Sequence, residues 1–202
     1  MTAFPDGFFA RDDERPDPEF YAVPRFVTHL DDRAVDGVGA LYDELALTGD
    51  VLDLMSSWVS HFRTAPRSLT VLGLNADELA ANPQADTRVV QDLNALPTLP
   101  FADGSFDAVV NCVSIDYLVQ PVAVLSEVLR VLRPGGLSVC TFSNRCFPTK
   151  AVRGWLTVAE QDRPFVVAEY HRQAGFAEPQ VAQRLTATWR HDPLWEVWAA
   201  RP

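Results

Sequence analysis

The stretch that decides the fold is Gly49-Asp-Val-Leu-Asp-Leu-Met-Ser-Ser-Trp-Val-Ser-His61. Residues 51–54 form a short apolar run typical of a buried strand, and Asp53 lies near its carboxyl end. A helix-like segment is expected directly afterwards. An open α/β sheet builds its ligand pocket at such strand ends. Glycines often let a ligand approach the backbone there, whereas Met55 and two serines occupy the turn here. The sequence therefore predicts a pocket with an unusual turn.

Composition excludes several classes of protein. The 202 residues are enough for one domain with a full core, and 48% of them are hydrophobic. The net charge of −10 argues against non-specific nucleic-acid binding. No apolar run approaches the ~18 residues of a membrane span, and the acidic, proline-rich start is unlike a signal peptide. We expect a cytoplasmic protein that binds neither nucleic acid nor membrane.

The cysteines and the N-terminal residues give two further expectations. Cys112, Cys140 and Cys146 form no CxxC pair, which argues against a zinc site or a disulfide framework, and we expect no metal. Residues 1–33 have little periodicity, and their acidic side chains should keep the first twenty solvated. Residues 20–30 combine aromatic residues with one Arg and one His. We expect residues 1–33 to form an arm or lid that packs on a domain of residues 34–202.

The rest of the chain alternates between strand-like and helix-like segments. The strand candidates are residues 51–54, 69–74, 88–91, 106–113 and 137–142, and helical periodicity is clearest over residues 121–132. Unbroken apolar strands separated by helices indicate βαβ units and a largely parallel sheet. Residues 180–188 and 194–200 are two further strand-like runs joined by a turn at His191-Asp192-Pro193. They predict an antiparallel hairpin at the C-terminal end.

The ordered set of motifs resembles the class I S-adenosylmethionine-dependent methyltransferases of the type 11-like group. The motifs that carry the resemblance are DVLDL at 50–54, VLGLNA at 71–76, QDL at 91–93, LPFADGSFDAV at 99–109 and EVLRVLRPGG at 127–136. The chain also resembles a subgroup of bacterial and plant proteins that carries MSSWVSH after the first strand and SNRCFPTK after the fifth. The resemblance implies a Rossmann-like fold. It has a seven-stranded, mostly parallel sheet, a C-terminal antiparallel hairpin and helices on both faces.

The resemblance also implies S-adenosylmethionine as cofactor and assigns residues to it. Asp53, Met55 and Ser56 would face its methionine part, and Asn75 stands where the family has an acidic residue that holds the ribose. Asp92 would bind the adenine amino group, and Leu93 would pack on the ring. Val113 and Ser114 would line the sulfonium side. The missing glycines and Asn75 are departures from the family pattern, and the uncharged amide should bind the ribose hydroxyls less strongly.

Methyl transfer needs an aligned acceptor and, when the acceptor starts protonated, a base. The candidate bases are His29 and His61. Candidate substrate-binding residues lie in the arm, after the first strand and after the fourth and fifth strands: Tyr21, Arg25, Trp58, Tyr117, Asn144 and Arg145. We expect a small-molecule acceptor, and Arg25 and Arg145 hint that it is acidic. Two alternatives stay open: a methyltransferase-like binding or partner protein without turnover, and a reaction other than methylation with the same cofactor.

Overall fold

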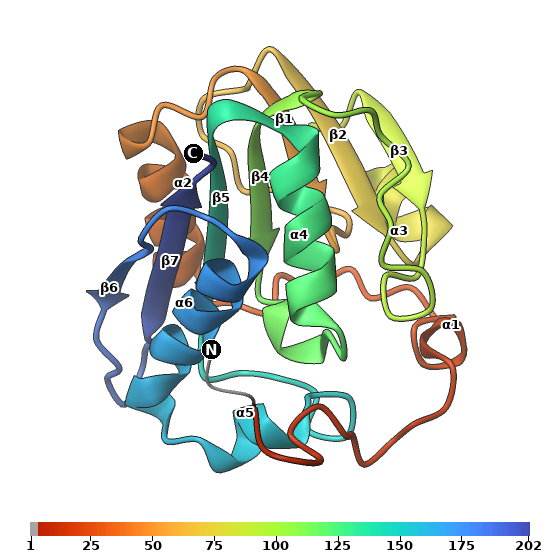
Figure 1. Ribbon diagram of the computed structural model, residues 1–202, viewed down its shortest axis with the longest axis vertical. Coiled ribbons are helices and arrows are strands. Elements are labelled where there is room, and N and C mark those ends of the chain that lie inside the picture. The colour runs from red at the N-terminus through yellow and green to blue at the C-terminus, as the bar shows by residue number, and fades with distance from the viewer. Residues whose placement is uncertain (1–3) are drawn as a thin grey trace.

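The computed structural model describes residues 4–202, and a seven-stranded sheet forms its centre (Figure 1). The strands are β1 Asp50–Leu54, β2 Ser68–Gly73, β3 Thr87–Val90, β4 Phe106–Cys112, β5 Leu132–Phe142, β6 Gln180–Leu185 and β7 Leu194–Ala200. Their order is β3-β2-β1-β4-β5-β7-β6. Strands β1 to β5 run parallel, and β7 pairs antiparallel with both β5 and β6. This confirms the predicted Rossmann-like methyltransferase sheet and its C-terminal hairpin.

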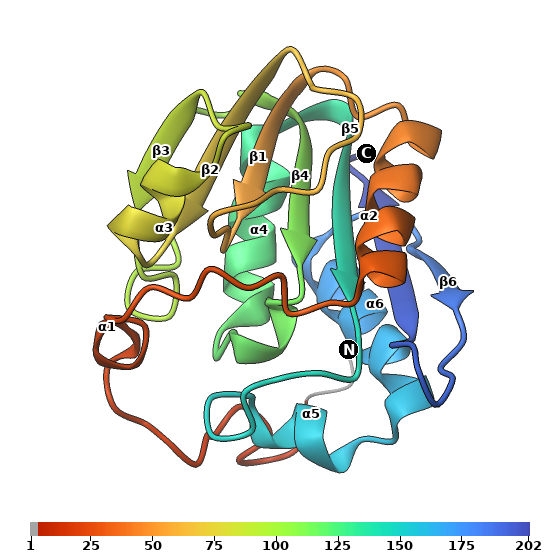
Figure 2. The same ribbon diagram turned by 180° about the vertical axis from the view of Figure 1, so that it is seen from behind.

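Helices cover both faces of the sheet. They are α1 Asp17–Phe20, α2 Asp32–Glu44, α3 Ala76–Ala81, α4 Pro121–Val131, α5 Arg153–Thr157 and α6 Arg163–Ala174, with single 3-10 turns at Ile115–Tyr117 and Glu160–Asp162. Helices α4 and α6 pack together on the face shown in Figure 1, and α2 and α3 lie on the face shown in Figure 2. Local sequence explains their bounds: Asp31 caps α2 by accepting a hydrogen bond from Ala34 N, and Gly175 ends α6 at a positive φ.

The segment between β1 and β2 is the main departure from the expected pattern, because residues 55–67 contain no helix. Positive φ angles at Met55 and His61 interrupt any helical path. The backbone carbonyls of this segment are satisfied by side chains instead. Asn82 Nδ2 donates to Ser57 O at 3.1 Å, and Gln84 Nε2 donates to Phe62 O at 2.7 Å. The prediction of a helix directly after the first strand is therefore wrong.

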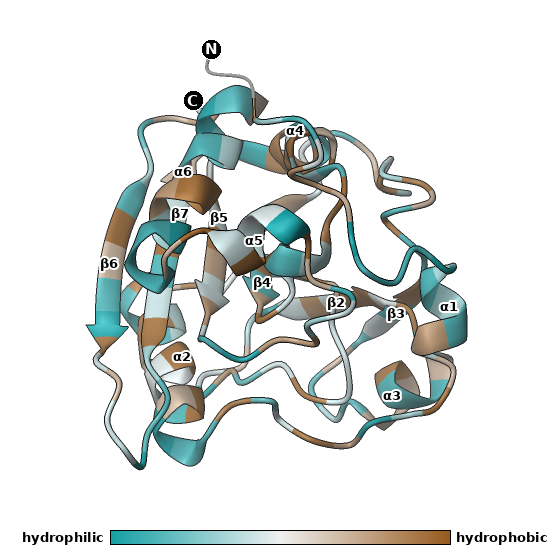
Figure 3. Cartoon of the chain, turned by 90° about the horizontal axis from the view of Figure 1, so that it is seen from below, coloured by the Kyte–Doolittle hydropathy of each residue, from teal (hydrophilic) through white to brown (hydrophobic). Residues whose placement is uncertain are grey.

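Residues before α2 follow the carboxyl ends of the strands, the end seen in Figure 3. Asp13 N donates to Thr149 O at 2.8 Å, which ties this segment to the chain after β5. Farther along, Asp17 accepts hydrogen bonds from Arg11 at 2.7 and 2.9 Å and lies 3.0 Å from Lys150 Nζ. These three charged side chains are buried. The expectation that the first twenty residues are all solvated is therefore wrong, since Arg11 and Asp17 are buried. Their burial is tolerated because each charge has a partner of opposite charge.

Two features bear on membranes and metals. Among the described residues, no helix combines the length and the apolar character that crossing a bilayer requires. Within residues 4–202, no group of three or more His, Cys, Asp or Glu side chains is arranged to hold a metal ion.

Candidate functional site

A cavity of about 540 Å³ lies at the carboxyl ends of β1 to β4, between the sheet and residues 17–29. This size is typical of a pocket for a small molecule. Its wall contains nearly every residue that the sequence singled out: Tyr21, Arg25, His29, Asp53, Met55, Ser56, His61, Asn75, Asp92, Leu93, Val113, Ser114, Tyr117, Asn144 and Arg145. Residues far apart in the chain are brought together because parallel strands end at one edge.

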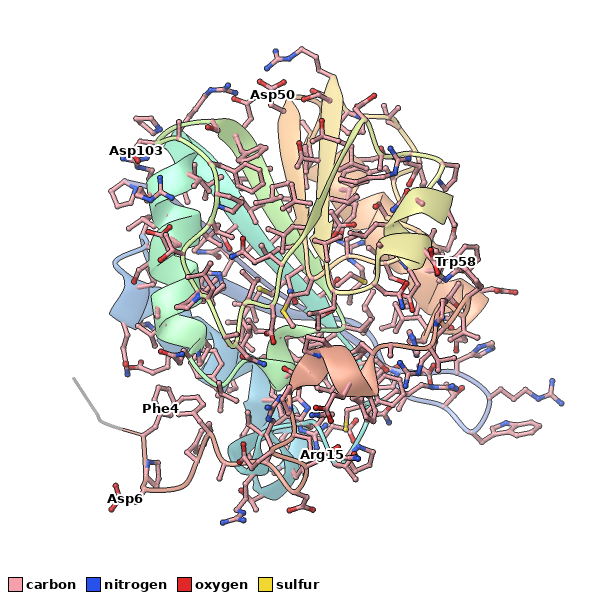
Figure 4. The ribbon with its side chains drawn as sticks, turned by 90° about the vertical axis from the view of Figure 1, so that its right-hand side faces the viewer. Phe4, Asp6, Arg15, Asp50, Trp58 and Asp103 are labelled. Atoms are coloured by element: carbon pink, nitrogen blue, oxygen red, sulfur yellow. The ribbon has the colours of Figure 1, made fainter. Side chains whose placement is uncertain are left out.

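Trp58 is the exception among the predicted site residues. It does not line the cavity, and Figure 4 shows it towards the outside of the molecule beside α3. Its indole Nε1 donates to Val27 O at 3.0 Å, and its ring meets Phe26 edge to face. Trp58 therefore joins the loop after β1 to the segment that crosses the cavity. In this arrangement its side chain is placed to hold that segment and not to contact a molecule in the cavity.

The turn after β1 is built without glycine. Met55 takes the left-handed conformation, with φ of 57°, which costs an L-residue about 1–2 kcal/mol. Ser56 N donates to Leu72 O at 2.8 Å, so the turn is pinned to β2. The close approach depends on Gly73, because a Cβ added there would lie 2.2 Å from Ser56 O. The close approach of the turn to β2 therefore requires a glycine at position 73, at the end of β2, and not in the turn itself.

Asp53 is a buried carboxylate of the cavity wall, with 4% of the residue exposed. Burial raises its pKa to about 6, although hydrogen bonds from Ser56 and Ser60 act in the opposite direction. Ser56 Oγ donates to Asp53 Oδ2 at 2.6 Å. No cation within residues 4–202 forms an ion pair with it. A cationic ligand is the partner that this carboxylate lacks.

The ends of β3 and β4 form the next part of the wall. Asp92 Oδ1 accepts hydrogen bonds from Asn94 N at 2.9 Å and Ala95 N at 3.2 Å, which fixes the carboxyl group, and Leu93 beside it is buried. After β4, Val113 has φ of 49°, a rare conformation for a β-branched residue. Ser114 Oγ then donates to Cys112 O at 2.8 Å. Strained backbone here is held by the surrounding structure, as is common at ligand sites.

Both candidate bases have pKa values below the usual range of histidine. Burial lowers the pKa of His61 to about 4, and burial also lowers that of His29. Both residues have positive φ, 60° and 59° respectively, and both line the cavity. His29 also meets the ring of Phe147 edge to face at 5.3 Å. Neutral imidazoles at pH 7 accept protons and do not repel a cationic ligand.

Aromatic and basic side chains form the opposite side of the cavity. The Arg25 guanidinium lies 4.8, 5.5 and 5.3 Å from the ring centroids of Phe20, Tyr21 and Phe147, and its Nη1 has no hydrogen-bond partner. Tyr117 OH accepts a hydrogen bond from Phe147 N at 2.8 Å, and burial raises its pKa. The cation–π contacts preorganise this wall.

The loop after β5 contributes the rest of this side. Asn144 and Arg145 line the cavity, and Arg145 Nε lies 2.7 Å from Asp192 in the turn before β7. Sequence reasoning missed two acidic residues of the wall, Asp17 and Glu78. Neither residue belongs to a motif at a strand end, so little in the sequence indicated that it would line the cavity. Only the folded path of residues 17–29 brings Asp17 to the cavity.

The comparisons with known proteins agree with this geometry. The protein-family model described as a methyltransferase domain matches residues 52–140. This span runs from β1 through most of β5 and includes the carboxyl ends of all four strands that form the cavity. Over this span the chain is similar to the class I S-adenosylmethionine-dependent methyltransferases.

Individual relatives cover less of the chain or are more distant. The ubiquinone/menaquinone biosynthesis C-methyltransferase UbiE of Geobacter sulfurreducens is 32% identical over 110 residues, which are 50% of this chain and 40% of the relative. The chain spans 40% or less of the length of the first curated relatives that it matches.

Two solved structures share the fold. The S-adenosylmethionine-dependent methyltransferase of Mesorhizobium loti has a TM-score of 0.56 and 16% identity, over 80% of this chain and 96% of that one. The 4+2 cyclase SpnF has a TM-score of 0.59 and 16% identity, over 84% of this chain and 82% of that one. At this identity the likeness shows the fold alone.

The residues of the cavity fit S-adenosylmethionine. This molecule carries a sulfonium and an ammonium group, and the wall offers the carboxylates of Asp53, Glu78 and Asp92. None of the three forms an ion pair with a cation of the described chain. The half-buried His29 and His61 are neutral at pH 7, because their pKa values are lowered. The charge of the wall thus complements the charge of the cofactor.

Proposed function

We propose that the protein catalyses S-adenosylmethionine-dependent methyl transfer to a small-molecule acceptor by direct in-line displacement. The observation that carries the proposal is a cavity lined by neutral histidines, Arg25, aromatic rings and carboxylates that form no ion pair within residues 4–202. The cofactor supplies an electrophilic methyl group when bound. The new bond forms between that carbon and the acceptor, the bond to sulfur breaks, and its electron pair stays on sulfur. An acceptor that starts protonated gives its proton to His29 or His61.

In this proposal Asp53, Met55 and Ser56 hold the methionine part of the cofactor, and Asp92 and Leu93 hold the adenine. Val113 and Ser114 line the sulfonium side. Support comes from their positions at the ends of β1, β3 and β4, around one cavity. Such positioning alone supplies much of the rate enhancement in a two-substrate transfer.

The acceptor lies in this proposal between residues 17–29 and the loop after β5. Tyr21, Arg25, Tyr117, Asn144 and Arg145 form that side. We propose that residues 1–33 act as a lid over the methyltransferase domain of residues 34–202, opening to admit the acceptor. The enclosed cavity favours a small molecule, the net charge of −10 disfavours nucleic acid, and we expect the protein in the cytoplasm.

A second candidate is a reaction other than methylation at the same site. It is favoured by one observation: the cyclase SpnF has this fold. The two candidates differ in the fate of the cofactor. A methyltransferase consumes S-adenosylmethionine stoichiometrically and releases S-adenosylhomocysteine, whereas the second candidate leaves the methyl group in place. A methyltransferase-like partner protein without turnover binds the cofactor and releases nothing.

The first experiment is titration calorimetry of the full chain with S-adenosylmethionine and S-adenosylhomocysteine. We expect both to bind with one-to-one stoichiometry. If neither binds at millimolar concentration, the enzyme proposal is wrong. Incubation with a panel of small aromatic and acidic acceptors then follows, with release of S-adenosylhomocysteine measured by mass spectrometry. The matched control is His191→Gln, a histidine in the β6–β7 turn outside the cavity, which should bind and turn over like wild type.

A further inference from the structure

The amide of Asn75 has no hydrogen-bonding capacity left for a ribose. Its Oδ1 accepts from Asp77 N at 3.0 Å and from Glu78 N at 3.1 Å, as the cap of α3. Its Nδ2 donates to Tyr21 O at 2.9 Å and to Ala22 O at 3.3 Å. An amide has two donor hydrogens and two acceptor lone pairs. All four are in use, so Asn75 holds the arm to α3 and is not free to bind hydroxyl groups.

Glu78, one turn further along α3, has the capacity that Asn75 lacks. Its Oε1 accepts from Arg25 N at 2.7 Å, and its Oε2 accepts from Ser57 Oγ at 2.5 Å. A carboxylate offers about four acceptor sites, so each oxygen keeps one after these bonds. The residue is half-buried and lines the cavity. Two donors from separate segments therefore fix a carboxylate at the wall and leave it able to accept further bonds.

The geometry points to Glu78 as the residue that holds the vicinal hydroxyls of the cofactor ribose, with Ser57 positioning its carboxylate. This rests on the proposed use of S-adenosylmethionine. In this assignment the ribose-binding carboxylate lies on α3 and not at the end of β2, where Asn75 stands. Its negative charge allows charge-assisted hydrogen bonds to the hydroxyls, which the amide of Asn75 cannot form. The MSSWVSH segment has a function in this arrangement, because its second serine orients the relocated acid.

The same carboxylate couples the arm to the cofactor. Arg25 N donates to Glu78 in the arrangement in which residues 21–29 lie across the cavity. A ribose bonded to Glu78 limits the carboxylate to the rotamer that also accepts from Arg25. Nucleoside binding and docking of the arm should therefore favour one another. Hydrogen exchange at the Arg25 amide should slow when S-adenosylhomocysteine binds, and the slowing should be lost in Glu78→Gln.

The test compares S-adenosylhomocysteine with its 2′-deoxy analogue by calorimetry. Wild type should prefer the ribose form by on the order of tenfold or more, because a hydrogen bond to a charged group is lost with the hydroxyl. Glu78→Gln should reduce that preference to about threefold or less. Asn75→Ala should keep the preference even if both affinities fall, since it loosens the arm without touching the ribose. Asp77→Asn, the exposed acid beside Glu78, is the matched control and should behave like wild type.

Retention of the preference in Glu78→Gln, or its loss in Asn75→Ala, overturns the assignment while leaving the proposed function intact. Absence of S-adenosylhomocysteine binding by wild type removes both proposals, so the two failures are distinguishable. Ser57→Ala keeps the carboxylate and provides a second variant if Glu78→Gln does not fold. It should lower the preference by a few-fold, and an unchanged preference in Ser57→Ala contradicts the positioning role of the serine.

Discussion

Strand β1 carries an aspartate at each end, and the two lie in opposite surroundings. Asp50, at the amino end of the strand and at the opposite side of the molecule from Arg15 in Figure 4, accepts hydrogen bonds from Arg67 at 2.6 and 2.9 Å, from Ser68 at 2.9 Å and from Arg133 at 3.0 Å. The Arg67 guanidinium holds its pKa well below the usual range. Asp53, at the carboxyl end, has no cation as partner and a raised pKa of about 6.

The difference shows how one sheet separates structure from function. At the amino edge the protein supplies the counter-charges itself, so the acid is satisfied before any ligand arrives. At the carboxyl edge Asp53 is desolvated and forms no ion pair within residues 4–202, so its charge remains available to a cationic ligand. Residues with strained backbone conformations also lie mostly at the carboxyl edge of the sheet, around the cavity. Of the five described non-glycine residues with positive φ, four line the cavity, and only Ala46 lies elsewhere.

The largest expected effect comes from neutralising the acid at the carboxyl end. Asp53→Asn keeps the shape of the side chain and removes its charge. We expect the affinity for S-adenosylhomocysteine to fall by about 10- to 100-fold, because a charge-assisted hydrogen bond is lost. Calorimetry at pH 7.5 measures it. An affinity within about twofold of wild type would show that Asp53 does not face the ligand.

The pH dependence sharpens this prediction. The folded pKa of Asp53 is raised to about 6, so its contribution to stability is present below the unfolded value and lost as the pH rises through 6. Ligand binding needs the ionised form and has the opposite dependence. The affinity for S-adenosylhomocysteine should fall about tenfold between pH 7 and pH 5. Asp53→Asn should be nearly flat over this range, and an equal slope in both proteins assigns the titration to another group.

The next effect concerns the backbone of the turn after β1. Met55→Val places a β-branched side chain at φ of 57° and should destabilise the protein by about 1–3 kcal/mol. Met55→Gly relieves the conformational strain but loses the packing of the side chain against the core, so its net change should stay within about 1 kcal/mol. Urea denaturation distinguishes the two variants. Equal stability of both would mean that position 55 does not keep the left-handed conformation in solution.

The sequence was most informative where local physics decides the structure. Apolar runs placed the strands, because burial along a strand depends on near neighbours. It failed after β1, where Met55 and His61 adopt conformations that no propensity favours and only tertiary contacts maintain.

The site was predictable to the extent that it depends on strand ends. Asp53, Asp92 and Val113 follow apolar runs, and they lie together in the cavity as expected. Trp58 and Glu78 could not be placed in this way. Their positions depend on how the arm crosses the cavity, through Val27 O for the indole and Arg25 N for the carboxylate. Long-range contacts of this kind leave no periodic signal in a single sequence.

The smallest expected effect comes from the acid at the amino end. Asp50→Asn removes the charge from an exposed network with Arg67 and Arg133, and exposed ion pairs contribute little to stability. The Tm should fall by less than in Met55→Val, and the difference from wild type should shrink at about 1 M salt, where such pairs are screened. The affinity for S-adenosylhomocysteine should not change. A loss of affinity as large as that in Asp53→Asn would mean that the two ends of β1 do not divide structure from binding, because a charge satisfied within the protein would then also act on the ligand.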